Sequence, residues 1–378
     1  MAAARAALAH APPTLNAGHD RKGPRAHDVA ERAVTSTLAT VEPVRPGVPP
    51  SLSARLFTPR TVASLLVAAI IVAVAVTRAP INWGDAWNKI RHANALLYLA
   101  ALIVFYSSFV VRAIRWRLLL RNAGESQPWP GLIGIIVTSF FVNCVVPAKM
   151  GDVYRAYLAR AKRHISASKA LGTIIAERLV DLCVLMALLL AAGAVVFHRK
   201  APGVLIPYVV AGTLVCCAGV GVVLTMRAGR GQRLLRLLPE AVFHRYESFR
   251  VGTVHSLGRF PTLIALTGTV WGMEAARLAF VVFALGDGNL LGPSQFLLVA
   301  LAAALLTTVP FLPGGLGLVE FGMVTVLVAV GGISKEAALS IAILDRSISY
   351  GSLVVLGFVV FLLTHVHAPK PRPPLVEA

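Results

Sequence analysis

Long apolar runs alternate with short polar segments along most of the chain, and this alternation predicts membrane-spanning helices. Each run is close to the roughly 17 to 25 residues that a helix needs to cross the hydrocarbon of a bilayer. The runs fall at about residues 61–77, 94–111, 131–147, 171–197, 203–226, 262–285, 293–309, 315–330 and 337–364. We therefore expect an all-α polytopic membrane protein, flanked by a disordered basic tail at 1–60 and a Pro-rich tail at 365–378.

Two breaks of one kind interrupt this pattern. Pro147 and Gly151 end the third run, and Pro313 and Gly317 separate the seventh run from the eighth, so each break has the form Pro-x-x-x-Gly. Proline ends a helix, and the freed backbone groups survive at membrane depth only where they line a cavity or are buried in protein. Broken segments at corresponding places in two halves of a membrane protein indicate a transport site.

The residues around each break also repeat. Glu177–Arg178 lies 26 positions after Gly151, and Asp345–Arg346 lies 28 positions after Gly317. An arginine precedes each proline, with Arg112 35 positions before the first and Arg277 36 positions before the second. These intervals predict an internal repeat with halves at about 61–197 and 203–364.

The distribution of basic residues orients the spans. The basic tail places the N-terminus in the cytoplasm by the positive-inside rule. A full crossing at 131–147 would export the basic stretch 149–169, so we expect a re-entrant hairpin that breaks at 143–151 and returns as the amphipathic stretch 152–169. The sequence thus predicts about six full spans plus two broken or re-entrant hairpins in an inverted repeat, with both termini cytoplasmic. Whether 293–330 spans or is re-entrant stays open.

Composition narrows the function classes. Hydrophobic residues make up 57% of the 378 residues and charged residues only 14%, which is typical of a membrane protein. The net charge of +19 comes from clusters beside the apolar runs, as orientation in a bilayer requires, so we expect no nucleic-acid partner. The four cysteines lack metal-ligand spacing, and the metalloprotease, Walker A and nucleophile-elbow motifs are absent. We expect no metal, no cofactor and a transporter rather than an enzyme.

Charged residues inside the predicted spans are the first candidate substrate contacts, because an unpaired charge at mid-helix costs about 2.5 kcal/mol or more. Arg178 and Asp181 can pair at i,i+3, whereas Glu177 and Asp181 share a helix face and repel unless a cation lies between them. Glu274 and Arg277 form a second i,i+3 pair. An ion-pair network that fixes packing and a lipid headgroup site both explain these charges, since an arginine fork suits a lipid phosphate.

The arginines at the end of the second span divide into two kinds. Arg112 is the deeper one, and we take it as the counterpart of Arg277. Arg115, Arg117 and Arg121 follow it towards the predicted cytoplasmic surface, where anchoring in the interface is the favoured interpretation.

Polar residues and glycines at the two breaks complete the candidate set. Glycine permits positive φ, and a half-helix starting near Leu316 would present free N–H groups to an anion, although a tight interhelical turn explains Pro-Gly-Gly equally. The predicted substrate-binding residues are Arg112, Asn143, Pro147, Lys149, Gly151, Asp152, Arg155, Glu177, Arg178, Asp181, Glu274, Arg277, Pro313, Gly314, Gly315, Gly317, Glu320, Asp345 and Arg346.

These residues carry a family resemblance over about residues 55–365. The matching elements are Asn143 to Pro147 with Gly151-Asp152 and Arg155, Glu177-Arg178-Leu179-Val180-Asp181, Pro313-Gly314-Gly315-Leu316-Gly317 with Glu320, and Asp345-Arg346 with Tyr350. They resemble the lysylphosphatidylglycerol synthase transmembrane family, also called the flippase-like integral membrane family. The resemblance implies movement of lysyl-phosphatidylglycerol or other lipid-linked substrates between leaflets. The soluble domain that transfers lysine is absent from this sequence, so lysyl transfer is not implied. Lys149 stands where many relatives carry arginine or glycine, which leaves headgroup choice open.

Three functions remain open on this basis. The first is binding or translocation of an anionic phospholipid or polyprenyl-linked lipid in a bacterial inner membrane. The second is an accessory subunit or membrane enzyme of envelope lipid or glycan synthesis, associated with a glycosyltransferase. The third is a structural partner of envelope-synthesis proteins. The expected ligand is a membrane lipid with a phosphate headgroup, while the lipid, direction, energy coupling and oligomeric state are left open.

Overall fold

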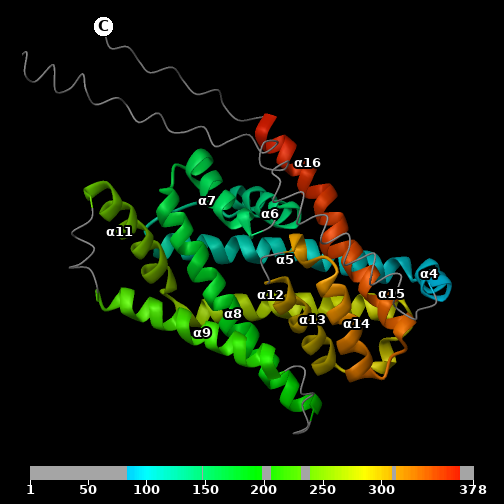
Figure 1. The fold of residues 1–378 in the computed structure, drawn as a ribbon. Coiled ribbons are helices and arrows are strands. Elements are labelled where there is room, and N and C mark those ends of the chain that lie inside the picture. The colour runs from blue at the N-terminus through cyan, green and yellow to red at the C-terminus, as the bar shows by residue number, and fades with distance from the viewer. Residues whose placement is uncertain (1–82, 147, 198–205, 231–238, 309–311, 367–378) are drawn as a thin grey trace, which may run out of the picture. The chain divides into compact units, whose positions relative to one another are not determined.

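The computed structural model describes residues 83–146, 148–197, 206–230, 239–308 and 312–366. Within these ranges every regular element is a helix, which confirms the predicted all-α class (Figure 1). The α-helices are α4 (Trp83–Arg91), α5 (Ala95–Asn122), α6 (Pro130–Val145), α7 (Met150–Arg163), α8 (Ala167–Phe197), α9 (Ile206–Arg227), α11 (Glu240–Val254), α12 (Phe260–Ala284), α13 (Pro293–Thr307), α14 (Leu318–Gly331), α15 (Lys335–Arg346) and α16 (Leu353–Val366). The expected span at 61–77, the N-terminal tail, Pro147 and residues 367–378 lie outside the described ranges.

Six segments of the described residues are long and apolar enough to cross a membrane. They are α5, α8, most of α9, α12, Pro313–Gly331 around α14, and Lys335–Leu363 across α15 and α16. Five of these match predicted full spans, and the sixth is the run at 315–330 whose crossing the sequence left open. The runs at 131–147 and 293–309 form α6 and α13 of 16 and 15 residues, which is short of the roughly 20 residues that a crossing needs.

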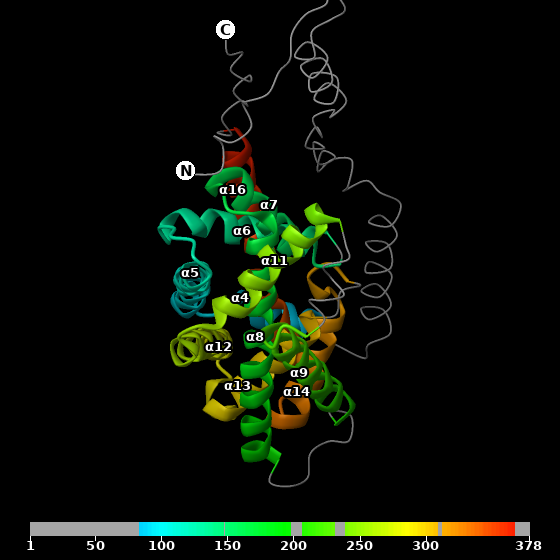
Figure 2. The ribbon, with the colours of Figure 1, turned by 90° about the vertical axis from the view of Figure 1, so that its left-hand side faces the viewer.

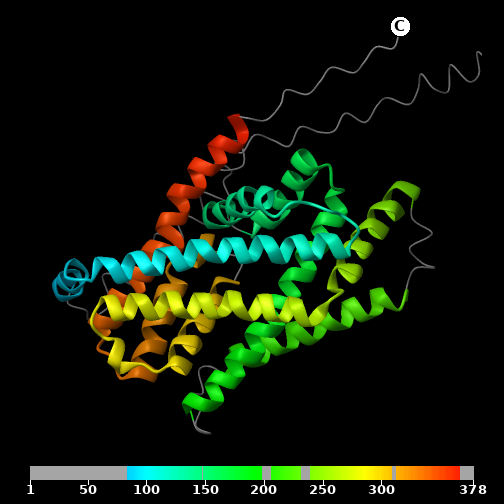
Figure 3. The same ribbon diagram turned by 180° about the vertical axis from the view of Figure 1, so that it is seen from behind.

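The helices of the two predicted halves interlock. α5 and α12 pack along each other over most of their length (Figure 3), and the view in Figure 2 looks along both of them. α8 packs against α11, α7 and α13, while α16 packs against α6. Apolar side chains fill the space between them, with Trp116, Ile136, Ile174 and Val281 fully buried. Burial of such side chains fixes which helix faces point inward, and it places the charged residues of several helices in one region.

The return arm of the first hairpin is an amphipathic helix, as predicted, but it ends at Arg163 instead of near residue 169. α7 is amphipathic, with Arg155, Leu158 and Ala159 on its buried face and Tyr157 exposed. Its last residue, Arg163, donates a hydrogen bond of 2.9 Å to the Gly131 carbonyl at the start of α6, so the ends of the two arms are tied together. α6 and α7 therefore form a closed helical hairpin.

The last span contains a feature that the sequence did not predict. Residues Ser347–Ser352 form a π-helical segment between α15 and α16, directly after Arg346. Two tyrosines of α5 hold it, because the hydroxyl of Tyr98 lies 2.9 Å from that of Ser347 and the hydroxyl of Tyr106 lies 2.8 Å from that of Ser352. π-helical turns are frequent at functional sites, since the extra residue per turn re-aims the side chains that follow.

The predicted orientation of the first hairpin has a direct test. With the four native cysteines replaced, a cysteine at Lys162 should stay unlabelled by an impermeant maleimide added to intact cells. A cysteine at Asn289, in the loop after α12 that the charge pattern places outside, is the matched positive control. Strong labelling at position 162 and no labelling at position 289 would show the opposite orientation. That result would exclude a hairpin that enters from the cytoplasm.

Candidate functional site

Arg115 is the centre of the first charge cluster. Its side chain is 1% exposed, and it donates hydrogen bonds to Glu177 Oε1 at 2.7 Å, to Asp181, and to Thr267 Oγ1 at 2.9 Å. The cation that Glu177 and Asp181 were expected to need between them is therefore Arg115. The interpretation of Arg115 as an interfacial anchor is wrong, because its guanidinium is buried between the carboxylates of α8 and Thr267 of α12. Arg117 and Arg121 are exposed.

Arg155 approaches the same cluster from α7. It is fully buried, its Nη1 lies 2.9 Å from Glu177 Oε2, and its guanidinium lies 3.9 Å from the centre of the Trp116 ring. Trp116 in turn donates to Thr173 Oγ1 at 3.2 Å. Cation–π stacking compensates part of the hydration that a buried guanidinium loses. Arg155 thus packs the hairpin against α5 and α8.

A second arrangement occurs once in each half. Arg178 of α8 donates from Nε and Nη2 to the two carboxylate oxygens of Asp152 in α7, at 3.1 Å each. Arg346 of α15 donates from Nε to Glu320 Oε1 in α14 at 2.8 Å and from Nη2 to the Gly314 carbonyl at 2.8 Å. In both pairs the two residues are 26 positions apart. Each arginine therefore holds the arm that follows the break in its own predicted half. We call the pairs Arg178–Asp152 and Arg346–Glu320 the clamps.

Glu274 connects the two predicted halves, and Asp345 extends the same network within the second half. Glu274 Oε1 lies 2.7 Å from Arg112 Nη2, and its Oε2 lies 3.1 Å from Arg277 Nη2. Arg277 Nη1 also lies 2.7 Å from Asp345 Oδ1. Adjacent Asp345 and Arg346 have different partners, as the 100° turn per helical residue predicts. The contacts make Arg115 the counterpart of Arg277, since each pairs with the acid that precedes the clamp arginine, and Arg112 instead bridges to α12.

The first break is held by Asn143. Its Oδ1 accepts the Gly151 N–H at 2.8 Å, and the Ser139 hydroxyl donates to the Gly151 carbonyl at 2.9 Å. A Cβ at position 151 would lie 2.0 Å from the Ser139 carbonyl oxygen, so only glycine fits. Ala148 and Lys149 adopt left-handed conformations with φ of 62° and 53°. Residues with a Cβ seldom occupy this region, which costs about 1–2 kcal/mol each.

The second break depends on three glycines. Gly314, Gly315 and Gly317 have φ of 56°, 70° and 81°, which confirms the need for positive φ that the sequence indicated. α14 begins at Leu318 rather than near Leu316. Glu320 Oε2 accepts a hydrogen bond from the Gly317 N–H at 2.7 Å. The carboxylate of Glu320 therefore occupies the helix N-terminus at which we expected an anion to bind.

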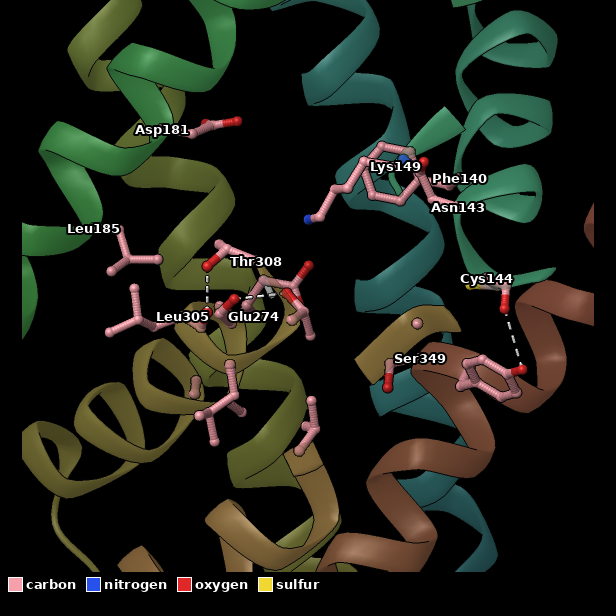
Figure 4. Close-up of a pocket in the computed structure, with 18 of the residues that line it drawn as sticks. Phe140, Asn143, Cys144, Lys149, Asp181, Leu185, Glu274, Leu305, Thr308 and Ser349 are labelled. Atoms are coloured by element: carbon pink, nitrogen blue, oxygen red, sulfur yellow. Dashed lines mark hydrogen bonds between the residues drawn. The ribbon is translucent and has the colours of Figure 1, made fainter. Parts of the chain in front are cut away.

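One cavity of about 730 Å³ joins the two breaks (Figure 4). Asn143 and Lys149 line one side of it, and Asp181 and Leu185 of α8 lie across from them. The predicted residues that line it are Arg112, Asn143, Lys149, Asp152, Arg178, Asp181, Glu274, Arg277, Gly314, Asp345 and Arg346. The predicted residues outside its lining are Gly151, Arg155, Glu177, Pro313, Gly315, Gly317 and Glu320, several of which support lining residues from behind. Pro147 lies outside the described residues.

The rest of the cavity wall is apolar. α8 and α9 contribute Leu182, Ala211 and Val215, and α13 contributes Ala303 and Leu306. Sequence reasoning missed this wall because small apolar residues in a span give no signal that separates a cavity from a core. Trp271 also lines the cavity and was missed, although a tryptophan three residues before Glu274 in an apolar span was a usable signal. The cavity therefore combines a charged side with an apolar side, as an amphiphile requires.

The fold and the cavity define a multi-pass membrane protein with a polar site between its helices. The chain belongs to the family described as the lysylphosphatidylglycerol synthase TM region, whose model matches residues 61–357. It is 31% identical to a UPF0104 membrane protein of Methanocaldococcus jannaschii over 225 residues, which cover 59% of this chain and 94% of that protein. A UPF0104 membrane protein of Pyrococcus horikoshii is 22% identical over 78% of this chain and 95% of its own length.

A further relative carries another name. The chain is 26% identical to the glycosyltransferase AglD of Haloferax volcanii over 76% of its own length, and it spans 52% of that protein. These relatives are archaeal, whereas the sequence led us to expect a bacterial inner membrane. The bacterial origin and the cytoplasmic termini stay predictions, while the multi-pass membrane class is established.

Replacement of Arg115 tests the first cluster. Arg115→Met should lower the free energy of unfolding by about 3–5 kcal/mol, because it leaves Glu177 and Asp181 buried with one cation fewer. Arg117→Met, two residues along the same helix and exposed, should change it by less than about 0.5 kcal/mol. SDS titration of the protein in mixed micelles measures both values. Equal effects of the two substitutions would show that Arg115 is an anchor after all.

Proposed function

We propose that the cavity binds a membrane lipid with a phosphate headgroup and carries it between the two leaflets. The observation that supports this most strongly is the joining of both breaks, four arginines and an apolar wall in one cavity. Apart from Lys149 and Asp152 at the first break, its charged residues lie within α5, α8, α12 and the last span, at positions where charge is retained for function or pairing. A headgroup on the charged side and a hydrocarbon chain on the apolar side account for both kinds of lining.

Each clamp has a role in this proposal. Arg178 and Arg346 each hold the arm after a break, so movement of either arm requires its clamp to exchange partners. A phosphate that competes with Asp152 or Glu320 for the guanidinium would release the arm on that side. The two breaks would then open the cavity to opposite leaflets in turn, as in transporters built from inverted repeats.

α9 is the most accessible wall of the cavity. Ala211, Gly212 and Val215 line the cavity, and the helix packs mainly against α8, with exposed apolar residues such as Leu214 and Leu224 along it. A helix that is apolar all round and lightly packed faces lipid in a membrane protein. We therefore place the path of the hydrocarbon chain beside α9.

The name of the Haloferax relative favours the second function retained from the sequence. In that alternative the cavity holds a lipid-linked substrate or product for an enzyme of glycan or lipid synthesis, and no transfer between leaflets occurs. The two functions share the binding site but differ in transport.

Filling the cavity from α9 tests transport. In vesicles that contain the protein and fluorescent phosphatidylglycerol, dithionite should quench the inner-leaflet lipid faster than in protein-free vesicles. Ala211→Trp, which projects into the cavity, should slow this exchange at least about tenfold. Ala218→Trp, an exposed position two turns further along α9 and outside the cavity lining, should leave it unchanged.

The outcomes separate the two functions. Exchange no faster than in protein-free vesicles would reject transport, and lipid binding that Ala211→Trp still blocks would then favour the synthesis-associated alternative. Equal exchange by both tryptophan variants would place the lipid path away from the cavity.

A further inference from the structure

Every arginine that lines the cavity already has a carboxylate partner. The pairs are Arg112 with Glu274, Arg178 with Asp152 and Asp181, Arg277 with Glu274 and Asp345, and Arg346 with Glu320. A ligand phosphate must therefore compete with a carboxylate for any of these guanidinium groups. These arginines therefore hold the helices around the site in place, and none of them offers a ligand a positive charge without a carboxylate partner.

Lys149 differs from them. It lines the cavity, yet none of the carboxylates that the structure describes lies within 4.0 Å of its ammonium nitrogen. Figure 4 shows the ammonium group extending into the open part of the cavity, towards the side formed by α8. An ammonium that no described carboxylate contacts is costly inside a membrane protein, and it favours the binding of an anion.

The backbone around Lys149 presents it to the cavity. Ala148 and Lys149 are consecutive residues with positive φ, and neither is glycine. Glycine would adopt this backbone conformation at both positions without strain. The chain instead has a strained backbone here, and the lysine side chain extends from it into the cavity. Such backbone strain is typical of ligand sites, where it holds a side chain in the direction that binding requires at a cost in stability.

A count of the charges agrees with this. The ion-paired groups balance, because six arginines face six carboxylates, and Lys149 brings the described cations at and behind the cavity wall to seven. The cations are Arg112, Arg115, Lys149, Arg155, Arg178, Arg277 and Arg346, and the carboxylates are Asp152, Glu177, Asp181, Glu274, Glu320 and Asp345. The residues that line the cavity give the same excess, with five cations and four carboxylates. Among the described residues, one negative charge on the ligand therefore completes the balance.

We propose that Lys149 is the residue that reads the lipid headgroup, and that the ligand carries a single negative charge on a phosphodiester, as phosphatidylglycerol does. This inference rests on the proposed function, because it assumes that the cavity binds a phosphate-bearing lipid. A phosphate monoester carries about 1.5 to 2 negative charges at neutral pH. A prenyl phosphate or phosphatidic acid therefore brings more negative charge than the site balances. A zwitterionic headgroup brings no net charge, so the site keeps its excess of one positive charge.

The test compares headgroups on one set of acyl chains. The thermal midpoint of the full-length protein in a nonionic detergent is measured with dioleoyl lipids that carry glycerol, choline or no alcohol on the phosphate. Phosphatidylglycerol should raise the midpoint most. Lys149→Gly should lose this preference, with an affinity for phosphatidylglycerol at least about tenfold lower, because a hydrogen bond to a charged group contributes at least that much.

His164→Gly is the matched control. His164 also has a positive φ of 56°, but it lies at the far end of α7 and outside the cavity lining. The substitution removes the same kind of backbone strain away from the site, so it should retain the full preference for phosphatidylglycerol. Lys149→Arg should also retain it, and Lys149→Gln should lose it without adding backbone flexibility. The glutamine variant keeps the test valid where added flexibility at 149 harms folding.

Each contrary result has a separate meaning. No stabilisation by any lipid would overturn the proposed function itself. Equal stabilisation by phosphatidylglycerol and phosphatidylcholine would retain a lipid site and overturn the charge argument. Stronger stabilisation by phosphatidic acid would overturn the single negative charge. A preference that persists in both Lys149→Gly and Lys149→Gln would assign the headgroup to another residue.

Discussion

Pairing of buried charges at mid-span is the constraint on which the rest of this structure depends. A charge that is taken from water into a membrane protein must find a partner, because removing one member of a buried pair costs about 3–5 kcal/mol. Arg115, Arg277 and Glu274 meet this requirement only when α5, α8, α12 and α15 lie together. The charged cluster therefore specifies the arrangement of helices whose surfaces are otherwise uniformly apolar, where burial of apolar area alone discriminates poorly between packings.

The repeated clamp links this packing to the proposed activity. Arg178 with Asp152 and Arg346 with Glu320 repeat one geometry, but the breaks that they hold differ. The second break uses three glycines, which reach positive φ without strain, whereas the first uses Ala148 and Lys149, which do not. The shared clamp gives both halves the same means of holding an arm. The difference between the breaks places a cation that no described carboxylate contacts at the first break only. Under the proposed function, the two breaks would therefore share a way of moving but differ in their contact with the ligand.

Much of the fold was readable from the sequence because length and hydropathy limit what can cross a bilayer. The interval between each break and its acid–arginine pair likewise marked Arg178 and Arg346 as counterparts, but it did not show that they bind Asp152 and Glu320. Arg115 was misassigned because three nearby arginines resemble an interfacial anchor, and only tertiary packing shows that one of them is buried between α8 and α12. The π-helical segment after Arg346 and the apolar wall from α9 and α13 were not predictable, because side-chain pairing with α5 and small apolar residues leave no periodic signal. Lys149 was singled out, but its lack of a carboxylate partner among the described residues is a property of three-dimensional placement.

We expect a lipid headgroup at Lys149, and an experimental structure of the protein in nanodiscs of mixed phosphatidylglycerol and phosphatidylcholine measures this directly. The predicted result is density for one phosphodiester within hydrogen-bond distance of the Lys149 ammonium, with a hydrocarbon chain running past Ala211 and Leu306. The clamp pairs should remain recognisable on at least one side of the cavity. A cavity without lipid density in a map that resolves annular lipids on the outer helix faces would contradict the account, because the unbalanced charge would then have no lipid ligand.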